Sequence, residues 1–297
     1  MNMFTIILSD SRFLLQILPG RLFFRIAGLT AVFFTVLFIF RVEAQDLDVP
    51  YVPTPTKVVN KMLEVADVGA GDYVIDLGSG DGRIMIAAAQ RGAYGHGVDI
   101  DPERVREAEG NARKAGVSDK VLFLEENIFN TDFRRASVVT MYLLSSVNMK
   151  LRSRLLDSLE PGTRVVSHDF DMGDWEPDKH LVEDEDDIFF WIIPAEVEGQ
   201  WIWETNGIKF KVTARQKYQE VELQVLSGDE ALIIKEDERV LVGDRLGFTA
   251  FNTANGNRYV YCGRVEGDTI TGKVQIRRPG DNNRVENWSA TIYRGIW

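Results

Sequence analysis

The chain has 297 residues, of which 45% are hydrophobic and 27% charged, so its composition is that of an ordinary globular protein able to bury a sizeable core. It holds 34 Lys and Arg against 45 Asp and Glu. The resulting net charge of −11 disfavours a nucleic-acid partner, because an acidic surface repels phosphate. A single cysteine, Cys262, excludes a disulfide or a thiolate metal site within this sequence, and we expect no bound metal.

Residues 1–45 are expected to lie outside the fold. Ile26–Phe40 is an uncharged apolar run that follows three arginines, and Val42–Ala44 resembles a signal-peptidase site. The segment is predicted to be a cleaved secretory signal or, if Leu22–Phe24 lengthen the run, an uncleaved membrane anchor. The arginines favour a cytosolic N-terminus, which would leave the rest of the chain on the outer, periplasmic side. A cytoplasmic location stays open.

Residues 46–194 predict a parallel α/β domain. Thr54 and Pro55 are expected to be the N-cap and the first residue of a helix, and Asp101 and Pro102 to begin another that runs to Gly116. Alternation of strands and helices is typical of a Rossmann-like, doubly wound sheet with helices on both faces. The apolar runs that predict its strands are Tyr73–Leu77, Gly97–Ile100, Val121–Leu124, Val138–Leu143 and Arg164–His168.

The pattern changes after this fifth strand. His180–Val182 and Ile188–Ile193 flank the acidic run Glu183–Asp187 and predict an antiparallel hairpin at the sheet edge. Residues 195–297 then predict a small all-β barrel or sandwich domain, because about eight short alternating runs recur between Gly-Asp and Asn-Gly turns.

A glycine-rich turn, Val74–Gly82, joins the first strand to the next helix. Gly78 and Gly80 let the backbone approach a ligand closely, and free N–H groups at the start of the helix point outward. The acidic Asp76 and Asp81 would repel a phosphate but suit the ammonium of an amino acid. Asp99, near the end of the second strand, can accept both hydroxyls of a ribose. We therefore interpret the turn as a site for S-adenosylmethionine (SAM) rather than NAD.

Three motifs, VIDLGSGDGR, GVDIDP and NIFN, resemble the successive cofactor motifs of class I, seven-β-strand SAM-dependent methyltransferases. More narrowly, VPYVPTP, DLGSGDGRI and RVVSHDFDMGDW resemble the bacterial relatives of the membrane-anchored mitochondrial protein-lysine methyltransferases. The resemblance covers about half of the chain.

The resemblance implies that Asp76, Gly78 and Gly80 hold the amino-acid part of SAM and that Asp99 holds its ribose. It also implies that Tyr51 and Thr54 close over the cofactor. Asn127 stands where the family often has an acidic residue that accepts the adenine amino group; its amide oxygen can still accept, so we expect weaker adenine recognition. The other motif residues of the predicted cofactor site are Ser79, Asp81, Gly82, Ile100 and Ile128.

Methyl transfer depends chiefly on positioning, and a lysine acceptor must also lose a proton. Tyr142 lies near the end of the fourth strand, where such enzymes place acceptor contacts, and we predict that it is catalytic together with Asp169. Asp171 is a second candidate base. His168 is interpreted as a structural histidine, and Glu183–Asp187 as a solvated turn that could attract a basic substrate.

These observations predict a SAM-dependent methyltransferase that acts on a protein lysine side chain, near a membrane if residues 1–45 are retained. Two alternatives stay open. One is an exported binding or scaffold module that keeps the fold without turnover, since an extracytoplasmic compartment lacks SAM. The other is a small-molecule methyltransferase with residues 195–297 as a substrate-binding lid.

Overall fold

The computed structural model describes residues 52–205, 207–235, 240–280 and 283–295. The chain divides into two units, Met1–Leu47 and Asp48–Trp297. The predicted signal peptide or anchor lies outside the described residues. Within the described ranges, no helix is both long enough and apolar enough to span a membrane.

Seven strands form the first sheet, in the order β3-β2-β1-β4-β5-β7-β6. Strands β1 to β5 pair in parallel, whereas β7 runs antiparallel to β5 and β6 antiparallel to β7. The predicted parallel sheet with an antiparallel edge hairpin is thus confirmed. The strands are β1 (Tyr73–Leu77), β2 (Tyr94–Asp99), β3 (Val121–Glu125), β4 (Val138–Met141), β5 (Arg164–His168), β6 (Lys179–Glu183) and β7 (Asp186–Ile192).

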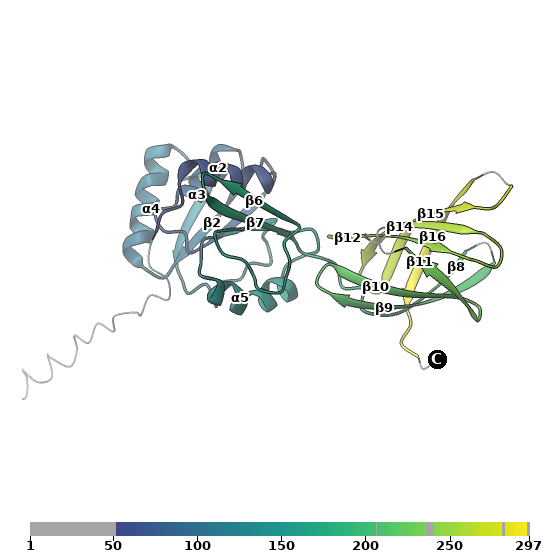
Figure 1. Ribbon diagram of the computed structural model, residues 1–297. Coiled ribbons are helices and arrows are strands. Elements are labelled where there is room, and N and C mark those ends of the chain that lie inside the picture. The colour runs from purple at the N-terminus through teal and green to yellow at the C-terminus, as the bar shows by residue number, and fades with distance from the viewer. Residues whose placement is uncertain (1–51, 206, 236–239, 281–282, 296–297) are drawn as a thin grey trace, which may run out of the picture. The chain divides into compact units, whose positions relative to one another are not determined.

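Helices cover both faces of this sheet, as Figure 1 shows. Successive residues of β1 point to opposite faces: Val74 packs in the core with α2, α3 and α4, whereas Ile75 and Leu77 pack in the core with α5. The sheet is therefore doubly wound, and the carboxyl ends of its parallel strands are free to hold a ligand. The helices are α2 (Thr56–Val65), α3 (Arg83–Gln90), α4 (Pro102–Ala115) and α5 (Ser145–Ser158).

Helix α4 begins and ends as predicted, but α2 does not. Asp101 caps α4 by accepting a hydrogen bond from the N–H of Glu103 at 2.8 Å, and Gly116 ends it in a left-handed conformation. Helix α2 begins at Thr56, and no side chain caps it, so the prediction that Thr54 caps this helix was wrong. The Thr54 hydroxyl is instead buried beside His168, with Oγ1 3.1 Å from Nδ1.

The strands after residue 194 form a second, antiparallel sheet that closes on itself. In the order β11-β10-β9-β8-β16-β15-β14-β13 each strand pairs with the next, and β13 pairs with β11 to complete a ring. Of the two predicted alternatives, this closure identifies a barrel rather than a sandwich. The strands are β8 (Gly199–Thr205), β9 (Ile208–Lys217), β10 (Glu220–Ser227), β11 (Glu230–Ile234), β12 (Val240–Val242), β13 (Arg245–Phe251), β14 (Arg258–Glu266), β15 (Thr269–Arg277) and β16 (Arg284–Ile292).

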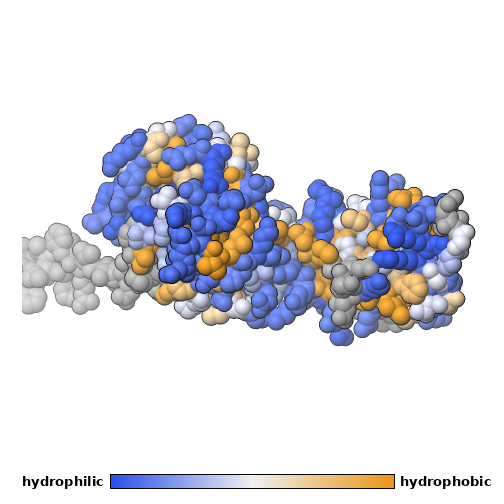
Figure 2. Space-filling view, turned by 45° about the horizontal axis from the view of Figure 1, so that its top comes forward, coloured by the Kyte–Doolittle hydropathy of each residue, from blue (hydrophilic) through white to orange (hydrophobic). Residues whose placement is uncertain are grey.

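Aromatic side chains fill the barrel. The ring of Trp203 lies 5.5 Å from Phe210, 5.2 Å from Tyr261 and 5.3 Å from Trp288, between centroids, and its Nε1 donates to the Tyr261 hydroxyl at 3.1 Å. Such tilted and stacked pairs stabilise a core beyond the burial of their area. The barrel therefore has a packed interior. On the face drawn in Figure 2, hydrophilic residues predominate, with hydrophobic residues between them.

Candidate functional site

The glycine-rich turn passes from the end of β1 into α3 and packs against the end of β2. The N–H groups of Gly78 and Ser79 both donate to the carbonyl of Val98 at 2.9 Å. Gly78, Gly80 and Gly82 have φ values of 80°, 52° and 81°, in the left-handed region that glycine adopts without strain. The turn is therefore held tightly against the end of β2, and Gly80 within it is buried.

Asp76 is buried at the end of β1, with 2% of its surface exposed. Its Oδ1 accepts a hydrogen bond from the Thr140 hydroxyl at 2.6 Å, while its Oδ2 has no partner. Burial raises the pKa of Asp76 to about 7, and the negative charges of Asp99 and Asp81 add to this effect. An ammonium beside Oδ2 would supply both the missing hydrogen bond and the missing charge, so the buried carboxyl fits the amino group of an amino acid.

Asp99 ends β2 and holds the turn from the other side. Its Oδ2 accepts from the N–H of Gly80 at 2.8 Å, and its Oδ1 accepts from the N–H of Asp101 at 3.0 Å. The half-buried carboxylate is thereby fixed beside the glycine turn, within electrostatic reach of Asp76. Ser79, in the glycine turn, is buried, and its hydroxyl has no hydrogen-bond partner. Asp76 and Asp99 thus flank one turn, as predicted.

Asp81 lies in a different environment from Asp76. It forms an ion pair with Arg83, whose guanidinium donates to both carboxylate oxygens, and an Nη of Arg83 also donates to the carbonyl of Thr54 at 2.8 Å. The pair ties the segment before α2 to the start of α3. Arg83 thus matches the charge of Asp81, and the contact of Asp81 with a ligand stays a prediction.

The predicted adenine contacts follow β2 and β3. The side-chain oxygen of Asn127 accepts from the N–H of Phe129 at 2.9 Å, which folds the chain after β3 into a tight turn. That oxygen keeps a second lone pair, so it can still accept from another donor. Ile100 and Ile128 are half-buried beside these turns.

A pocket of about 200 Å³ opens at this end of the sheet. It brings together the segment before α2, the glycine turn and the chain after β4 and β5. Of the predicted residues, Thr54, Ser79, Asp81 and Tyr142 line it. Asp76, Asp99, Asn127 and Asp169 are not among its lining residues, and Tyr51 lies outside the described residues. Its remaining lining residues are Val52, Pro53, Arg83, Ile84, Leu144 and Phe170.

Tyr142 lines this pocket and contacts Asp169, its predicted partner, as well as His168. Its hydroxyl donates to Oδ2 of Asp169 at 3.0 Å, and its ring lies 3.9 Å from that of His168, between centroids. Burial raises the pKa of Tyr142 to about 12, and the neighbouring Asp169 carboxylate contributes. The hydroxyl is therefore a hydrogen-bond donor at neutral pH, and a phenolate base is disfavoured. Asp171, the other candidate base, is exposed and accepts from the N–H of Gly173.

The acidic run of the edge hairpin contributes a residue that the sequence analysis did not single out. Asp186 Oδ1 lies 3.4 Å from Nε2 of His168. Asp184 pairs with Lys57 and Asp187 with His180. The interpretation of this run as a solvated turn therefore holds for Asp184, which is exposed, but not for Asp186, which faces β5.

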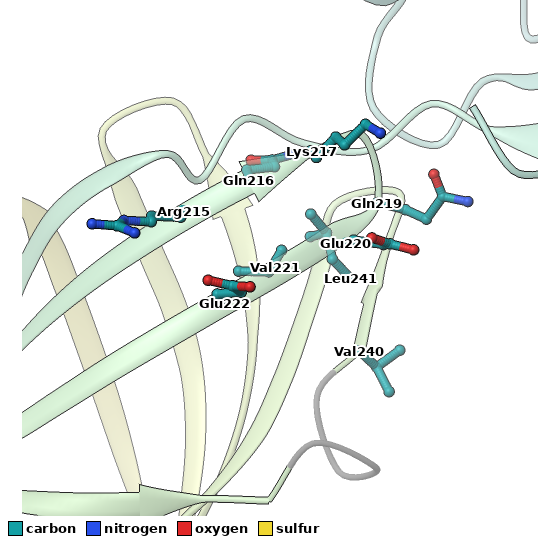
Figure 3. Close-up of a pocket in the computed structure, with 9 residues that line it drawn as sticks. All are labelled: Arg215, Gln216, Lys217, Gln219, Glu220, Val221, Glu222, Val240 and Leu241. Atoms are coloured by element: carbon teal, nitrogen blue, oxygen red, sulfur yellow. The ribbon is translucent and has the colours of Figure 1, made fainter. Parts of the chain in front are cut away.

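A separate and larger pocket lies on the barrel. It measures about 560 Å³ and is bounded by β9, β10 and β12, as Figure 3 shows. Its charged side chains Arg215, Lys217, Glu220 and Glu222 are exposed, and Arg215 and Glu222 stand opposite each other in the strand register. Opposite charges stand side by side in this register, and Lys217 pairs with Asp174 at 3.1 Å, so these residues do not by themselves indicate a ligand.

Comparisons with known proteins point to one family. The model of the ANTKMT methyltransferase domain matches residues 76–179, a span that runs from Asp76 to the edge hairpin. A protein-lysine N-methyltransferase of Saccharolobus islandicus (strain REY15A) is 49% identical over 140 residues, which cover 46% of this chain and 86% of that protein. An adenine nucleotide translocase lysine N-methyltransferase of Mus musculus is 34% identical over 139 residues, or 46% of this chain and 60% of that protein.

A solved structure is also similar in sequence. The RNA methyltransferase from Salinibacter ruber, in complex with S-adenosyl-L-homocysteine, is 54% identical. The match covers 49% of this chain and 96% of that chain, with a TM-score of 0.48.

Proposed function

Because this chain belongs to the family of class I SAM-dependent methyltransferases that includes the archaeal protein-lysine N-methyltransferase, we propose that it methylates the side chain of a protein lysine. Membership makes it a methyltransferase that takes SAM as its methyl donor. The lysine acceptor is the proposed part, supported by the relatives that are named for lysine methylation.

One observation carries the assignment to this site. Asp76 lies at the end of β1, two residues before the first glycine of the turn, with a buried carboxylate oxygen that has no partner, and its pKa responds to the charge of Asp99, which holds the turn by a hydrogen bond from Gly80. A purely structural turn would not need a buried carboxyl with a free oxygen, because such a group destabilises the fold unless a ligand completes it.

SAM supplies a methyl group attached to a sulfonium. In the proposed site, Asp76 binds the ammonium of its amino-acid part, and Asp99 accepts hydrogen bonds from its ribose hydroxyls. Ser79 offers a buried hydroxyl, and Asn127 offers the second lone pair of its amide oxygen to the adenine. Pro53 and Thr54 line the pocket, and the Arg83–Thr54 hydrogen bond holds that segment down, which limits the access of water.

On the acceptor side, Tyr142 lines the pocket and forms a hydrogen-bonded pair with Asp169. The Tyr142 hydroxyl stays protonated, so its role is to orient the acceptor and to hold Asp169. The half-exposed Asp169 carboxylate is then the group that accepts a proton from a lysine ammonium, directly or through a water. Phe170 lines the same pocket with an apolar surface suited to the methylene chain of lysine.

Calorimetric titration with SAM tests the first step. We expect one SAM per chain, and Asp99→Ala should abolish measurable binding because it removes both the ribose contact and the restraint on Gly80. Asp171→Ala, which removes an exposed carboxylate outside the pocket, is the matched control and should leave the affinity unchanged. Absence of binding at millimolar SAM would refute the proposal.

Labelling with methyl-tritiated SAM tests the acceptor. A membrane extract and a soluble extract are each incubated with the purified protein, and the products are divided between protease and ribonuclease digestion. Label that is lost with protease and recovered as methyl-lysine after acid hydrolysis supports the proposal. Label that is lost with ribonuclease would replace lysine by an RNA acceptor, and label in the small-molecule fraction would revive the small-molecule alternative.

The N-terminal segment stays a proposal that rests on composition. We infer that residues 1–45 are a signal or membrane anchor, from the apolar run and the preceding arginines. Protease accessibility of a full-length protein in intact and opened cells tests which side Ala44 onward occupies. Protection by the cytoplasmic membrane would place the site beside the SAM pool and remove the motive for the scaffold alternative.

A further inference from the structure

Three ionisable side chains meet where β5 ends and β7 begins. His168 is the last residue of β5, Asp169 follows it, and Asp186 is the first residue of β7. Nε2 of His168 lies 3.5 Å from Oδ2 of Asp169 and 3.4 Å from Oδ1 of Asp186, and the three ligand atoms lie within 4.8 Å of one another. We propose that these three side chains bind a divalent transition-metal ion such as Zn²⁺.

The environment of His168 is the first reason to propose a metal ion. His168 is completely buried, and its Nε2 has no hydrogen-bond partner although it points toward two carboxylates. Its other nitrogen, Nδ1, lies 3.1 Å from the Thr54 hydroxyl oxygen. An imidazole that donates from Nδ1 to Thr54 keeps a lone pair on Nε2, which is the arrangement of a metal-bound histidine with an outer hydrogen bond. A metal cation would accept the lone pair of the buried Nε2 and so give this nitrogen the partner that it lacks.

The negative charges of Asp169 and Asp186 are the second reason to propose a metal ion. The side chains of Asp169 and Asp186 are 28% and 29% exposed, so water screens them only in part. In the portion of the chain that the structure describes, neither carboxylate pairs with a lysine or an arginine. Asp169 is oriented by the Tyr142 hydroxyl and by the N–H of Asp187, but these neutral donors leave its charge in place. The cluster therefore lacks a positive charge.

The spacing distinguishes a metal ion from a lysine ammonium. Zn²⁺ forms bonds of about 2.1 Å to nitrogen and oxygen, and tetrahedral geometry then separates the ligand atoms by about 3.4 Å. An ammonium donates at about 2.8 Å, so three acceptors around it would lie about 4.6 Å apart. The distances from Nε2, 3.4 and 3.5 Å, match the metal. One imidazole with two carboxylates suits a first-row transition metal better than Mg²⁺.

Calorimetric titration with Zn²⁺ tests the proposal, in untagged protein carrying Cys262→Ser so that the exposed thiol does not compete. We expect one Zn²⁺ per chain and a higher melting temperature in its presence. Asp186→Asn should weaken binding at least about tenfold. Asp169→Asn should do the same, and its fold is secure because Asn tolerates the φ of 58° found at this position.

Asp187→Asn is the matched control, since it removes the same charge from the same strand but from a carboxylate that pairs with His180. It should bind Zn²⁺ within about twofold of the parent. The proposal is overturned if the parent shows no saturable binding, if Asp186→Asn binds as tightly as the parent, or if Asp187→Asn loses binding, which would assign the ion to His180. These measurements are made without SAM, so they report Zn²⁺ binding separately from methyl transfer; with the ion bound, Asp169 would be its ligand and not the base for lysine.

Discussion

The proposed contact of Asp76 with the SAM ammonium would make the affinity for SAM depend on pH. The carboxyl has a pKa of about 7 in the folded protein against an ordinary value of 3.8, so it binds a proton more tightly when folded. An ammonium ligand needs the ionised form. We therefore predict that the affinity for SAM rises between about pH 5 and 7 and that Asp76→Asn, which cannot ionise, removes this rise and weakens binding at pH 7.5 by at least about tenfold. Calorimetric titration across this range measures both effects.

The same residue makes an opposite prediction for the ligand-free fold. Since its folded pKa is raised, the protein loses stability as the pH rises from about 4 to about 7 and stays at the lower level above that range. Asp76→Asn avoids this loss and should be more stable than the parent at pH 8, by about 1–3 kcal/mol in the free energy of unfolding. A variant that is less stable than the parent at pH 8 would mean that the carboxyl is ionised without cost.

The proposed role of Tyr142 is to position the acceptor. Tyr142→Phe removes the hydrogen bond to Asp169 and leaves the ring in place. We expect kcat to fall about 10- to 100-fold, because positioning of the acceptor is impaired, while the dissociation constant for SAM stays within about twofold. The pH profile of the residual activity should keep its shape, since the phenol with a pKa of about 12 does not titrate in the assay range. A large loss of SAM binding would instead assign Tyr142 to the cofactor site.

The positions of Asp76 and Asp99 in the fold followed from the sequence more readily than the contacts of the neighbouring side chains did. Asp76 and Asp99 could be identified because strand ends and glycine spacing place them at one turn. The pairing of Asp81 with Arg83 and the contact of Asp186 with His168 could not. The motif suggests a ligand role for Asp81 as readily as a pairing with Arg83. The contact of Asp186 with His168 depends on the register of an antiparallel hairpin, which the sequence leaves open.

At the scale of elements, the join between β1 and α3 depends on Gly82. A Cβ atom added there would lie 2.7 Å from Cζ of Phe123 and 2.9 Å from Cβ of Ala108, in a backbone with φ of 81°. We predict that Gly82→Ala lowers the free energy of unfolding by about 3 kcal/mol, from left-handed strain and overpacking together. Denaturant unfolding monitored by circular dichroism measures the loss.

Gly116→Ala is the control for that prediction. Gly116 ends α4 with φ of 71°, but an added Cβ there meets no atom within 4 Å. Gly116→Ala should therefore lower the free energy of unfolding only through left-handed backbone strain, by about 1 kcal/mol. Equal losses in the two variants would mean that the packing of Phe123 against the turn adds nothing to stability.

Element types were predicted more securely than their ends. β5 was predicted at Arg164–His168 and is found there, because Pro161-Gly162 marks its start. β2 begins three residues earlier than predicted, since Tyr94-Gly95-His96 lacks the apolar pattern of a buried strand. Gly95 is required there by the close approach of Val74 rather than by a turn. β12 has three residues and is too short to show any periodicity.

At the scale of the whole molecule, the boundary near Pro194 is a prediction that truncation tests. Trp175 is fully buried, its Nε1 donates to Gln219 at 2.8 Å, and its ring lies 5.7 Å from that of Tyr218. A chain that ends at Pro194 should therefore melt at a lower temperature, while its affinity for SAM stays within about threefold because the described site residues precede this point. Thermal unfolding and calorimetry measure the two quantities.

Truncation removes both the Trp175–Gln219 hydrogen bond and the rest of the barrel, and Gln219→Ala in the full chain removes the hydrogen bond alone. It removes the partner of a buried indole N–H and should cost about 1–2 kcal/mol in the free energy of unfolding. SAM binding by the full chain should be unchanged. If the truncated chain fails to bind SAM while Gln219→Ala binds normally, residues 195–297 take part in the cofactor site, contrary to the proposed division.

The closed ring of the barrel also decides how this part of the chain comes apart. Each of its eight strands is hydrogen-bonded to a neighbour on both sides, so no strand can separate unless two sets of inter-strand hydrogen bonds break together. β12 is fastened along one side, to β13. Amide protons of β12 should exchange with heavy water first, and those of the ring should exchange late and together, as a single cooperative opening.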